Sequence, residues 1–146
     1  MSVELPEATI LATQMNEELP GKRVGSCSLA NYEKLQRIGF VNRNVEDFDQ
    51  LIGGTIDSVT SRGTVIRTDL NNDMNLLLAP EYGGRIRLHS SGETLPKEFH
   101  IRLGFTDGTF LTVRLTSMGL IYAVSDESLE KVYVYRRDFL GGVSPV

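Results

Sequence analysis

The chain has 146 residues, of which 40% are hydrophobic, 8% aromatic and 23% charged, and its formal net charge at pH 7 is −4. This length fits one domain of ordinary size, which buries enough surface to fold without disulfides. The single cysteine, Cys27, excludes an intramolecular disulfide and a cysteine-built zinc site. No apolar run approaches the ~18 residues of a membrane span. The acidic balance argues against a free-standing DNA-binding protein, although it allows a basic stripe on one face. We therefore expect a single cytoplasmic domain over residues 1–146.

The first predicted element is a helix over residues 4–19. Glu4 and Glu7 suit the positive end of the helix dipole, and Pro6 fits a first turn because its missing N–H is no loss there. A Pro-Gly pair directly after the last apolar residue ends the helix. Apolar residues at helical spacing predict one buried face, made of Ile10, Leu11, Met15 and Leu19.

The next segment mixes a strand, an ambiguous stretch and a second helix. Residues 22–30 resemble a strand, whereas residues 31–43 have no clear period. A short helix is predicted over residues 45–52, because Asn44 is a suitable N-cap, two acids fill the first turn and a Gly-Gly pair follows.

From residue 55 onward the hydrophobic period changes to about two, which indicates strands. The Asp107-Gly108 pair between two alternating runs is a strong hairpin signal. Residues 125–131 favour a capped helical turn. The pattern predicts an antiparallel β-sandwich or barrel of about eight strands, flanked by one long and one short helix. The runs after residue 55 are 55–60, 63–69, 74–78, 85–88, 100–103, 109–115 and 120–124.

The most distinctive feature is Glu4-Leu5-Pro6-Glu7 at the start of the first helix. On composition alone, capping and dipole complementation explain such a pair of acids. Residues 3–10 also resemble the start of the formamidopyrimidine-DNA glycosylase and endonuclease VIII family, which begins Met-Pro-Glu-Leu-Pro-Glu and continues into a helix. Weaker resemblances to the family follow in order along nearly the whole chain, at residues 19–24, 56–63, 76–84, 105–109 and 140–145.

The resemblance implies a two-sheet antiparallel β-sandwich with two flanking helices, in agreement with the hydrophobic pattern. Complete family members add a helical domain and usually a zinc or zincless finger, and we expect these domains to be absent from residues 1–146. We accordingly expect no cofactor in this chain. The chain is then either an excised first domain or a truncated relative. The implied partner is damaged double-stranded DNA, acted on in base excision repair.

The family's chemistry implies roles for the first residues. Its nucleophile is the N-terminal amine, usually of proline, which attacks C1′ of the damaged nucleoside and forms a Schiff base. Glu4 and Glu7 match the family's two acids, of which the first moves protons at the sugar and the second supports the site. Val3 stands at the proline position, and Ser2 precedes it as one extra residue. Ser2 becomes terminal if Met1 is removed, so Ser2 and Val3 are both candidates for the amine.

Three further positions depart from the family pattern. Thr64 stands where the resemblance places a hairpin lysine that assists base loss, beside Arg62, and residues 35–96 contain no lysine. Tyr82 stands near the apolar residue that fills the gap left by the extruded base. Met118 lies in a later loop that contains no arginine, where the family has paired cations.

The candidate site residues are therefore of two kinds, with Glu4, Glu7, Ser2 and Val3 as catalytic candidates and Arg62, Thr64, Tyr82 and Met118 as DNA-binding candidates. The departures predict a DNA glycosylase and AP lyase relative that is catalytically impaired. The alternative is a non-catalytic scaffold of the same fold that binds nucleic acid or protein. An unrelated sandwich with an accidental match at its start is the third possibility.

Other chemically notable residues have structural explanations. His89 and His100 lack a carboxylate partner at ligand spacing, so we expect structural or surface roles for them. Cys27 lies in a predicted strand, which favours a buried small hydrophobe. Four arginines alternate along the predicted strands and form either a solvated sheet face or a phosphate-tracking stripe. These arginines are Arg85, Arg87, Arg102 and Arg114.

Overall fold

The computed structural model describes residues 4–42, 44–62, 65–79, 85–115 and 119–131. Within these residues eight strands form two antiparallel four-stranded sheets, which confirms the predicted fold class. In chain order the elements are α1 (Glu4–Glu18), β1 (Val24–Leu29), α2 (Glu33–Arg37), the 3₁₀ helix η1 (Val45–Leu51), β2 (Ile56–Arg62), β3 (Val65–Leu70), β4 (Met74–Ala79), β5 (Arg85–His89), β6 (Ile101–Phe105), β7 (Phe110–Arg114), β8 (Leu120–Ser125) and the 3₁₀ helix η2 (Asp126–Lys131).

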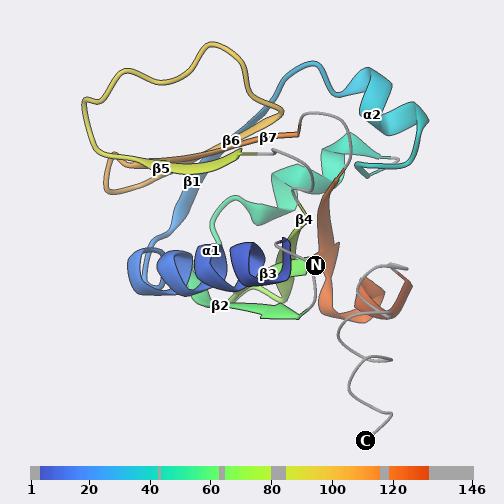
Figure 1. Ribbon diagram of the computed structural model, residues 1–146, viewed down its shortest axis with the longest axis horizontal. Helices are drawn as coiled ribbons and strands as arrows, with labels where there is room; N and C mark the ends of the chain where they lie inside the picture. Colours follow the sequence, from blue (N-terminus) through green and yellow to red (C-terminus); the bar gives the residue numbers. More distant parts are fainter. Residues whose placement is uncertain (1–3, 43, 63–64, 80–84, 116–118, 132–146) are drawn as a thin grey trace, which may run out of the picture.

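The two sheets are separate layers of a sandwich. The first sheet has the strand order β1-β6-β7-β5 and the second has the order β2-β3-β4-β8 (Figure 1). The chain therefore crosses between the sheets three times, from β1 to β2, from β4 to β5 and from β7 to β8. These crossings resolve the sandwich-or-barrel alternative in favour of the sandwich.

The core fills the space between the sheets and is densest at β4. Every residue of β4 is buried, because one of its faces meets the first sheet and the other is covered by η2. Leu76 and Leu78 join the main core, whereas Leu77 packs with Val65 and with Leu129 of η2. Burial on both faces explains why residues 76–79 form an apolar run instead of alternating with polar residues.

Helix α1 lies along one open side of the sandwich and contacts β2 and β3 (Figure 1). Ala8, Ala12 and Met15 form its buried face, which Leu19 continues just after the helix. The predicted face is therefore wrong for Ile10, whose exposed fraction is 56%. Ile10 lies about 200° around the helix from Ala8, on the solvent side. Ala8 and Ala12 form the N-terminal part of the buried face. Their small side chains allow the helix to pack closely on β2.

The predicted helix over residues 45–52 is confirmed in position but is a 3₁₀ helix, η1. Its N-cap is Asn44, whose Oδ1 accepts a hydrogen bond from the backbone N–H of Glu46 at 3.1 Å, as expected for a cap. Phe48 and Leu51 of η1 are fully buried. Because η1 contacts β1 of the first sheet and β4 and β8 of the second, it fills the sandwich from within. The ambiguous stretch before it contains the five-residue helix α2.

A buried asparagine ties this region to strand β8. Asn42, with an exposed fraction of 5%, donates from Nδ2 to the carbonyl of Ala123 at 2.7 Å and accepts at Oδ1 from the Ala123 N–H at 2.9 Å. Its side chain therefore pairs with both backbone groups of Ala123 in an edge strand, as a neighbouring strand would. Nδ2 also donates to Asp47 of η1 at 3.1 Å, which holds η1 against β8.

Cys27 packs on the main core from β1 with its side chain partly buried. Burial, together with the charge of Asp49, raises the pKa of Cys27 to about 12. The thiol is therefore neutral at physiological pH and acts as a small hydrophobe, in line with the interpretation from sequence.

Candidate nucleic-acid interface

One edge of the sandwich gathers the strand ends that flank, in the sequence, several of the predicted site residues. In the second sheet, Arg62 pairs with Val65 across the β2–β3 hairpin, and Ala79 at the end of β4 pairs with Leu120 at the start of β8. In the first sheet, the start of β5 pairs with the end of β7, Arg85 opposite Arg114. The connections 80–84 and 115–119 join these strand ends from sheet to sheet. We call this edge, bounded by Arg62, Val65, Ala79, Arg85, Arg114 and Leu120, the loop edge.

Helix α1 directs its first turn toward the loop edge. Asn16, near the end of the helix, accepts at Oδ1 from the N–H of Val59 in β2 at 2.8 Å, and Gly21 donates to the carbonyl of Ile56 at 2.8 Å. The end of α1 thus lies beside the start of β2, and the two elements run in opposite directions. From Asn16 the helix extends back ~18 Å to its first residue, whereas β2 continues only ~10 Å from Val59 to Arg62. The first turn therefore reaches the level of the β2–β3 hairpin.

The structure describes three of the eight predicted site residues. Glu4 and Glu7 are in the first two turns of α1, and Arg62 is the exposed last residue of β2. The other five candidates lie outside the described residues. These five are Ser2, Val3, Thr64, Tyr82 and Met118.

The opposite end of the sandwich, which we call the turn edge, consists of residues 19–24, 53–56, 70–74 and 105–110. Here Lys22 forms an ion pair with Asp107 and donates from Nζ to Oγ1 of Thr109 at 3.0 Å. The hydrogen bond from Lys22, reinforced by Thr109, holds the pKa of Asp107 well below its usual range. Asp107 and Gly108 form the hairpin turn that the sequence predicts, with Gly108 at φ +90°.

Sequence reasoning missed a buried polar chain on the first sheet. His89, with an exposed fraction of 3%, lies 3.0 Å from Oε2 of Glu93 through Nδ1 and 2.8 Å from Oγ1 of Thr112 through Nε2. The expectation that His89 lacks a carboxylate partner is therefore wrong, whereas its structural role holds. The signal was present as Ser-Ser-Gly between His89 and Glu93, a tight turn that folds the acid back onto the ring.

His100 supports the loop edge directly. Its Nδ1 accepts a hydrogen bond from the backbone N–H of Leu115 at 2.9 Å. Burial, helped by the nearby Arg114 guanidinium, lowers the pKa of His100. The ring is thus held neutral with its proton on Nε2, which leaves Nδ1 free to accept. His100 thereby fixes the last described residue before the β7–β8 connection.

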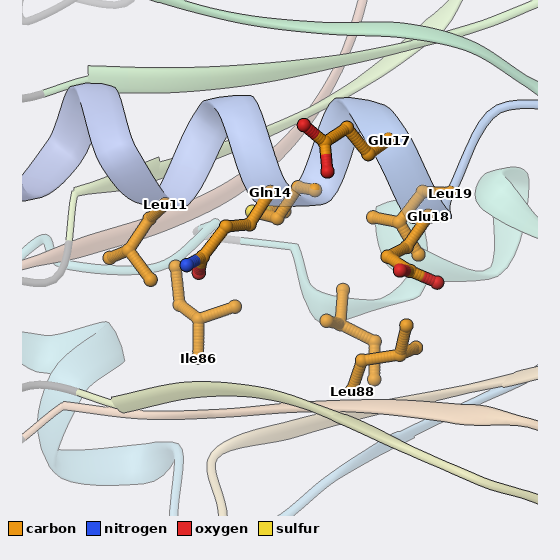
Figure 2. A pocket seen from close by; sticks show the side chains of 9 residues that line it. Leu11, Gln14, Glu17, Glu18, Leu19, Ile86 and Leu88 are labelled. Carbon is orange, nitrogen blue, oxygen red and sulfur yellow. The ribbon is translucent and has the colours of Figure 1, made fainter.

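A groove of about 430 Å³ lies between α1 and the first sheet (Figure 2). Leu11 of α1, Leu19 just after it, and Ile86 and Leu88 of β5 give it an apolar part (Figure 2). Gln14, Glu17 and Glu18 of α1 line it as well (Figure 2). The groove opens because α1 packs on β2 of the second sheet and leaves β5 partly uncovered.

In the described part of the chain, no group of three or more His, Cys, Asp or Glu residues could hold a metal ion, and no helix is long and apolar enough to cross a membrane.

The outer face of the first sheet carries the alternating arginines. Arg102 of β6 stacks on two aromatic rings, at 5.0 Å from the centroid of Phe99 and 5.9 Å from that of Phe110. Arg85, Arg87 and Arg114 instead line a polar pocket at the loop edge. The four arginines therefore fall into two sets. Arg102 is held by stacking, and the other three line the pocket.

Comparison with known proteins places this architecture. A family model, the Formamidopyrimidine-DNA glycosylase N-terminal domain, matches residues 3–117. The chain belongs to this family. The glycosylase-family match covers α1, strands β1 to β7 and all of the loop edge except Leu120, which agrees with the resemblance carried by residues 3–10.

Similar proteins are formamidopyrimidine-DNA glycosylases. That of Lactococcus lactis subsp. cremoris is 22% identical over 134 residues, which cover 92% of this chain and 47% of the relative. That of Acidothermus cellulolyticus is 29% identical over 106 residues, 72% of this chain and 36% of the relative. This chain thus spans half or less of the length of these relatives.

Solved structures of the same kind share the fold. A Lactococcus lactis Fpg (MutM) in complex with DNA containing N7-benzyl-Fapy-dG superposes with a TM-score of 0.74 and 19% identity, covering 91% of this chain and 48% of that one. MutM in complex with DNA containing carbocyclic 8-oxo-G also gives a TM-score of 0.74 at 19% identity, over 91% and 49% of the two chains.

Proposed function

We propose that this chain is the sandwich domain of a base-excision-repair protein that binds damaged double-stranded DNA at its loop edge and is impaired in glycosylase and AP lyase chemistry. The observation that carries the proposal is the gathering of six strand ends, paired as Arg62 with Val65, Ala79 with Leu120 and Arg85 with Arg114, at one edge of a domain of this family. Helix α1 directs its first turn toward the same edge. Glu4, Glu7 and Arg62 belong to that edge. Relatives of this fold are solved with lesion-containing DNA. A cytoplasmic location stays a prediction.

The impairment follows from the side chains available at the loop edge. Thr64 stands at the position of the family's hairpin lysine, and a hydroxyl does not carry the positive charge that assists a departing base. Residues 35–96 contain no lysine that a shift of register could supply. Val3 or Ser2 in place of proline at the amine further changes where the nucleophile stands, and a misplacement of ~1 Å costs about 10²-fold in rate.

Borohydride trapping tests the covalent step. The chain is mixed with a duplex that contains one abasic site, from about pH 6 to 9, where an α-amine passes from mostly protonated to mostly free. We expect no trapped adduct above the level without protein, whereas a full-length formamidopyrimidine-DNA glycosylase gives one. An adduct that forms with this chain and is lost in Glu4→Gln would contradict the impairment while leaving the repair role in place.

A second candidate function is a non-catalytic scaffold that binds nucleic acid or protein. The net charge of −4 and the lysine-free stretch favour it. Salt dependence separates the two partners, because a protein that contacts phosphates loses affinity linearly in log salt. Tight binding of duplex DNA with a steep salt slope supports the DNA-binding proposal. A chain that binds no duplex even at low salt is left with protein partners.

A further inference from the structure

A polar pocket of about 300 Å³ lies on the outer face of the first sheet, where β5 and β7 reach the loop edge. Its walls carry four cations and one carboxylate, together with the hydroxyl of a threonine. The cations are Arg85, Arg87, Lys97 and Arg114, the carboxylate is Glu98 and the hydroxyl belongs to Thr112. The concentration of positive charge contrasts with the acidic balance of the whole chain.

The arginines are placed where they repel one another. Arg85 and Arg114 are direct partners across the β5–β7 ladder, and Arg87 follows two residues later on the same face. Like charges directly opposite in an antiparallel pair are destabilising. Glu98 relieves only Arg114, through an exposed pair at 3.5 Å. Among the described residues neither Arg85 nor Arg87 forms an ion pair within 4 Å, although the more distant carboxylate of Glu93 interacts with Arg87. Four cations against these two carboxylates leave the cluster with a net positive charge that an anion would neutralise.

The pocket also contains a fixed, buried hydroxyl. Thr112, with an exposed fraction of 2%, lies between Arg87 of β5 and Arg102 of β6 in one row across the sheet. Its Oγ1 is held 2.8 Å from Nε2 of His89, and Glu93 holds the other side of that ring. The hydrogen bonds from Glu93 through His89 thus hold the Thr112 hydroxyl in place in the pocket. Arginines on an ordinary solvated sheet face need no such fixed polar group beneath them.

We propose that this pocket binds a phosphate group, held by Arg85, Arg87 and Arg114 with Lys97 at the rim. The planar guanidinium groups match phosphate oxygens in paired hydrogen bonds. DNA is the favoured source, because the pocket starts at Arg85 and Arg114 on the loop edge, where the proposed function places the duplex. With DNA as the source of the phosphate, this inference rests on the proposed function. The pocket then contacts a backbone phosphate beyond the lesion, and fixes the position of the sandwich on the duplex irrespective of sequence.

Binding of labelled duplexes by the whole chain tests the inference. Fluorescence anisotropy is measured over a salt series for an undamaged duplex and for the same duplex with one abasic site. Arg85→Gln/Arg87→Gln removes two pocket charges, and Lys34→Gln/Arg37→Gln removes two exposed charges from α2 as the matched control. The pocket variant should bind both duplexes about tenfold more weakly at roughly 50 mM salt, with a log–log salt slope shallower by about 1.

Two outcomes of this experiment would overturn the inference. One is an equal loss in the α2 control, which assigns the effect to net charge. The other is wild-type affinity and slope in the pocket variant, with circular dichroism confirming that it is folded. A larger loss on the abasic duplex than on the undamaged one would contradict a purely backbone contact.

A second arm uses inorganic phosphate alone and separates the pocket from the proposed function. Phosphate at fixed ionic strength should raise the unfolding temperature of the wild type and of the α2 control by more than it raises that of the pocket variant. The reason is that a ligand stabilises only the state it binds. If the wild type binds no duplex, the proposed function fails. If phosphate still raises the unfolding temperature of the wild type but not of the pocket variant, the pocket is a site for free phosphate or a nucleotide. If the wild type binds no duplex and phosphate raises the unfolding temperature equally in all three proteins, both the proposed function and the phosphate pocket are overturned.

Discussion

The two edges of the sandwich are built on different principles. At the turn edge, short turns are tied by hydrogen bonds between described residues, such as Lys22 with Asp107 and Thr109, and Asn71 with the N–H of Thr55 at 2.9 Å. At the loop edge, the strands end in connections between the sheets and in arginines that face solvent or a pocket. The turn edge therefore specifies the fold, whereas the loop edge is available for binding. Substitutions at the turn edge and in the core should change stability, and substitutions at the loop edge should change DNA affinity.

The largest expected loss of stability follows replacement of Asn42, a buried residue of the core. Asn42→Ala removes both hydrogen bonds to Ala123 and leaves a buried N–H and C=O of β8 without partners. The free energy of unfolding should fall by about 2–4 kcal/mol, measured by urea denaturation. Asn72→Ala is the control, because its hydrogen bond to Gln50 is exposed, and it should cost less than about 1 kcal/mol. Equal losses in the two variants would contradict the role of Asn42.

Gly54→Ala probes the turn edge. A Cβ at Gly54 would lie 2.7 Å from Oδ1 of Asn72 and 2.8 Å from Cδ2 of Leu70, closer than packed atoms approach. The crowding should lower the free energy of unfolding by about 1–3 kcal/mol. Gly25→Ala is a matched control at the same edge, since its Cβ would meet nothing nearer than 3.4 Å. A Gly54→Ala protein as stable as Gly25→Ala would indicate that the turn edge is not tightly packed.

Arg62→Gln probes the loop edge. Arg62 is exposed at the end of β2, so its replacement should change the free energy of unfolding by no more than about 0.5 kcal/mol. The affinity for duplex DNA should fall several-fold and the salt slope should decrease by about 1. Arg37→Gln on α2 gives the effect of losing one exposed charge elsewhere. A loss of stability without a loss of affinity would reverse the assignment of the two edges.

The smallest expected effect is the acid response of the turn edge. The hydrogen bond from Lys22, with those from Thr109, depresses the pKa of Asp107 in the folded protein. The stabilisation is therefore complete above the unfolded pKa of about 3.9 and is lost as the pH falls through the folded value. Asp107→Asn should flatten the fall of the unfolding temperature below about pH 4. Parallel curves for the two proteins would contradict the contribution of this pair.

Much of the fold could be predicted from local signals. Asn44 as a cap, the Asp107-Gly108 turn and the alternation along β5 and β7 each depend on residues adjacent in the chain. The error at Ile10 arose because the α1 face is selected by close packing of two alanines on β2, a contact between distant segments. The pairing of Arg85 with Arg114 likewise depends on strand order, which alternation alone does not determine.

The candidate site was predictable only to the extent that the family pattern specifies it. Residues 3–10 led to Glu4 and Glu7, and the antiparallel packing of α1 on β2 directs the first turn of the helix toward the end of β2 at Arg62. The chain from Glu93 through His89 to Thr112 was missed, because it joins a turn to a strand paired 23 residues later. Such a pairing needs the register of β5 against β7, in which His89 lies opposite Phe110.

Mapping backbone amide chemical shifts onto the two edges tests the central claim most directly. The ¹⁵N-labelled chain is titrated with a duplex that contains one abasic site. We expect perturbations at the loop edge, at Arg62, Val65, Arg85, Arg114 and Leu120, and no change at Asn71 and Asp107 of the turn edge. Perturbations centred on the turn edge, or none at any DNA concentration, would contradict the assignment of the loop edge as the nucleic-acid interface.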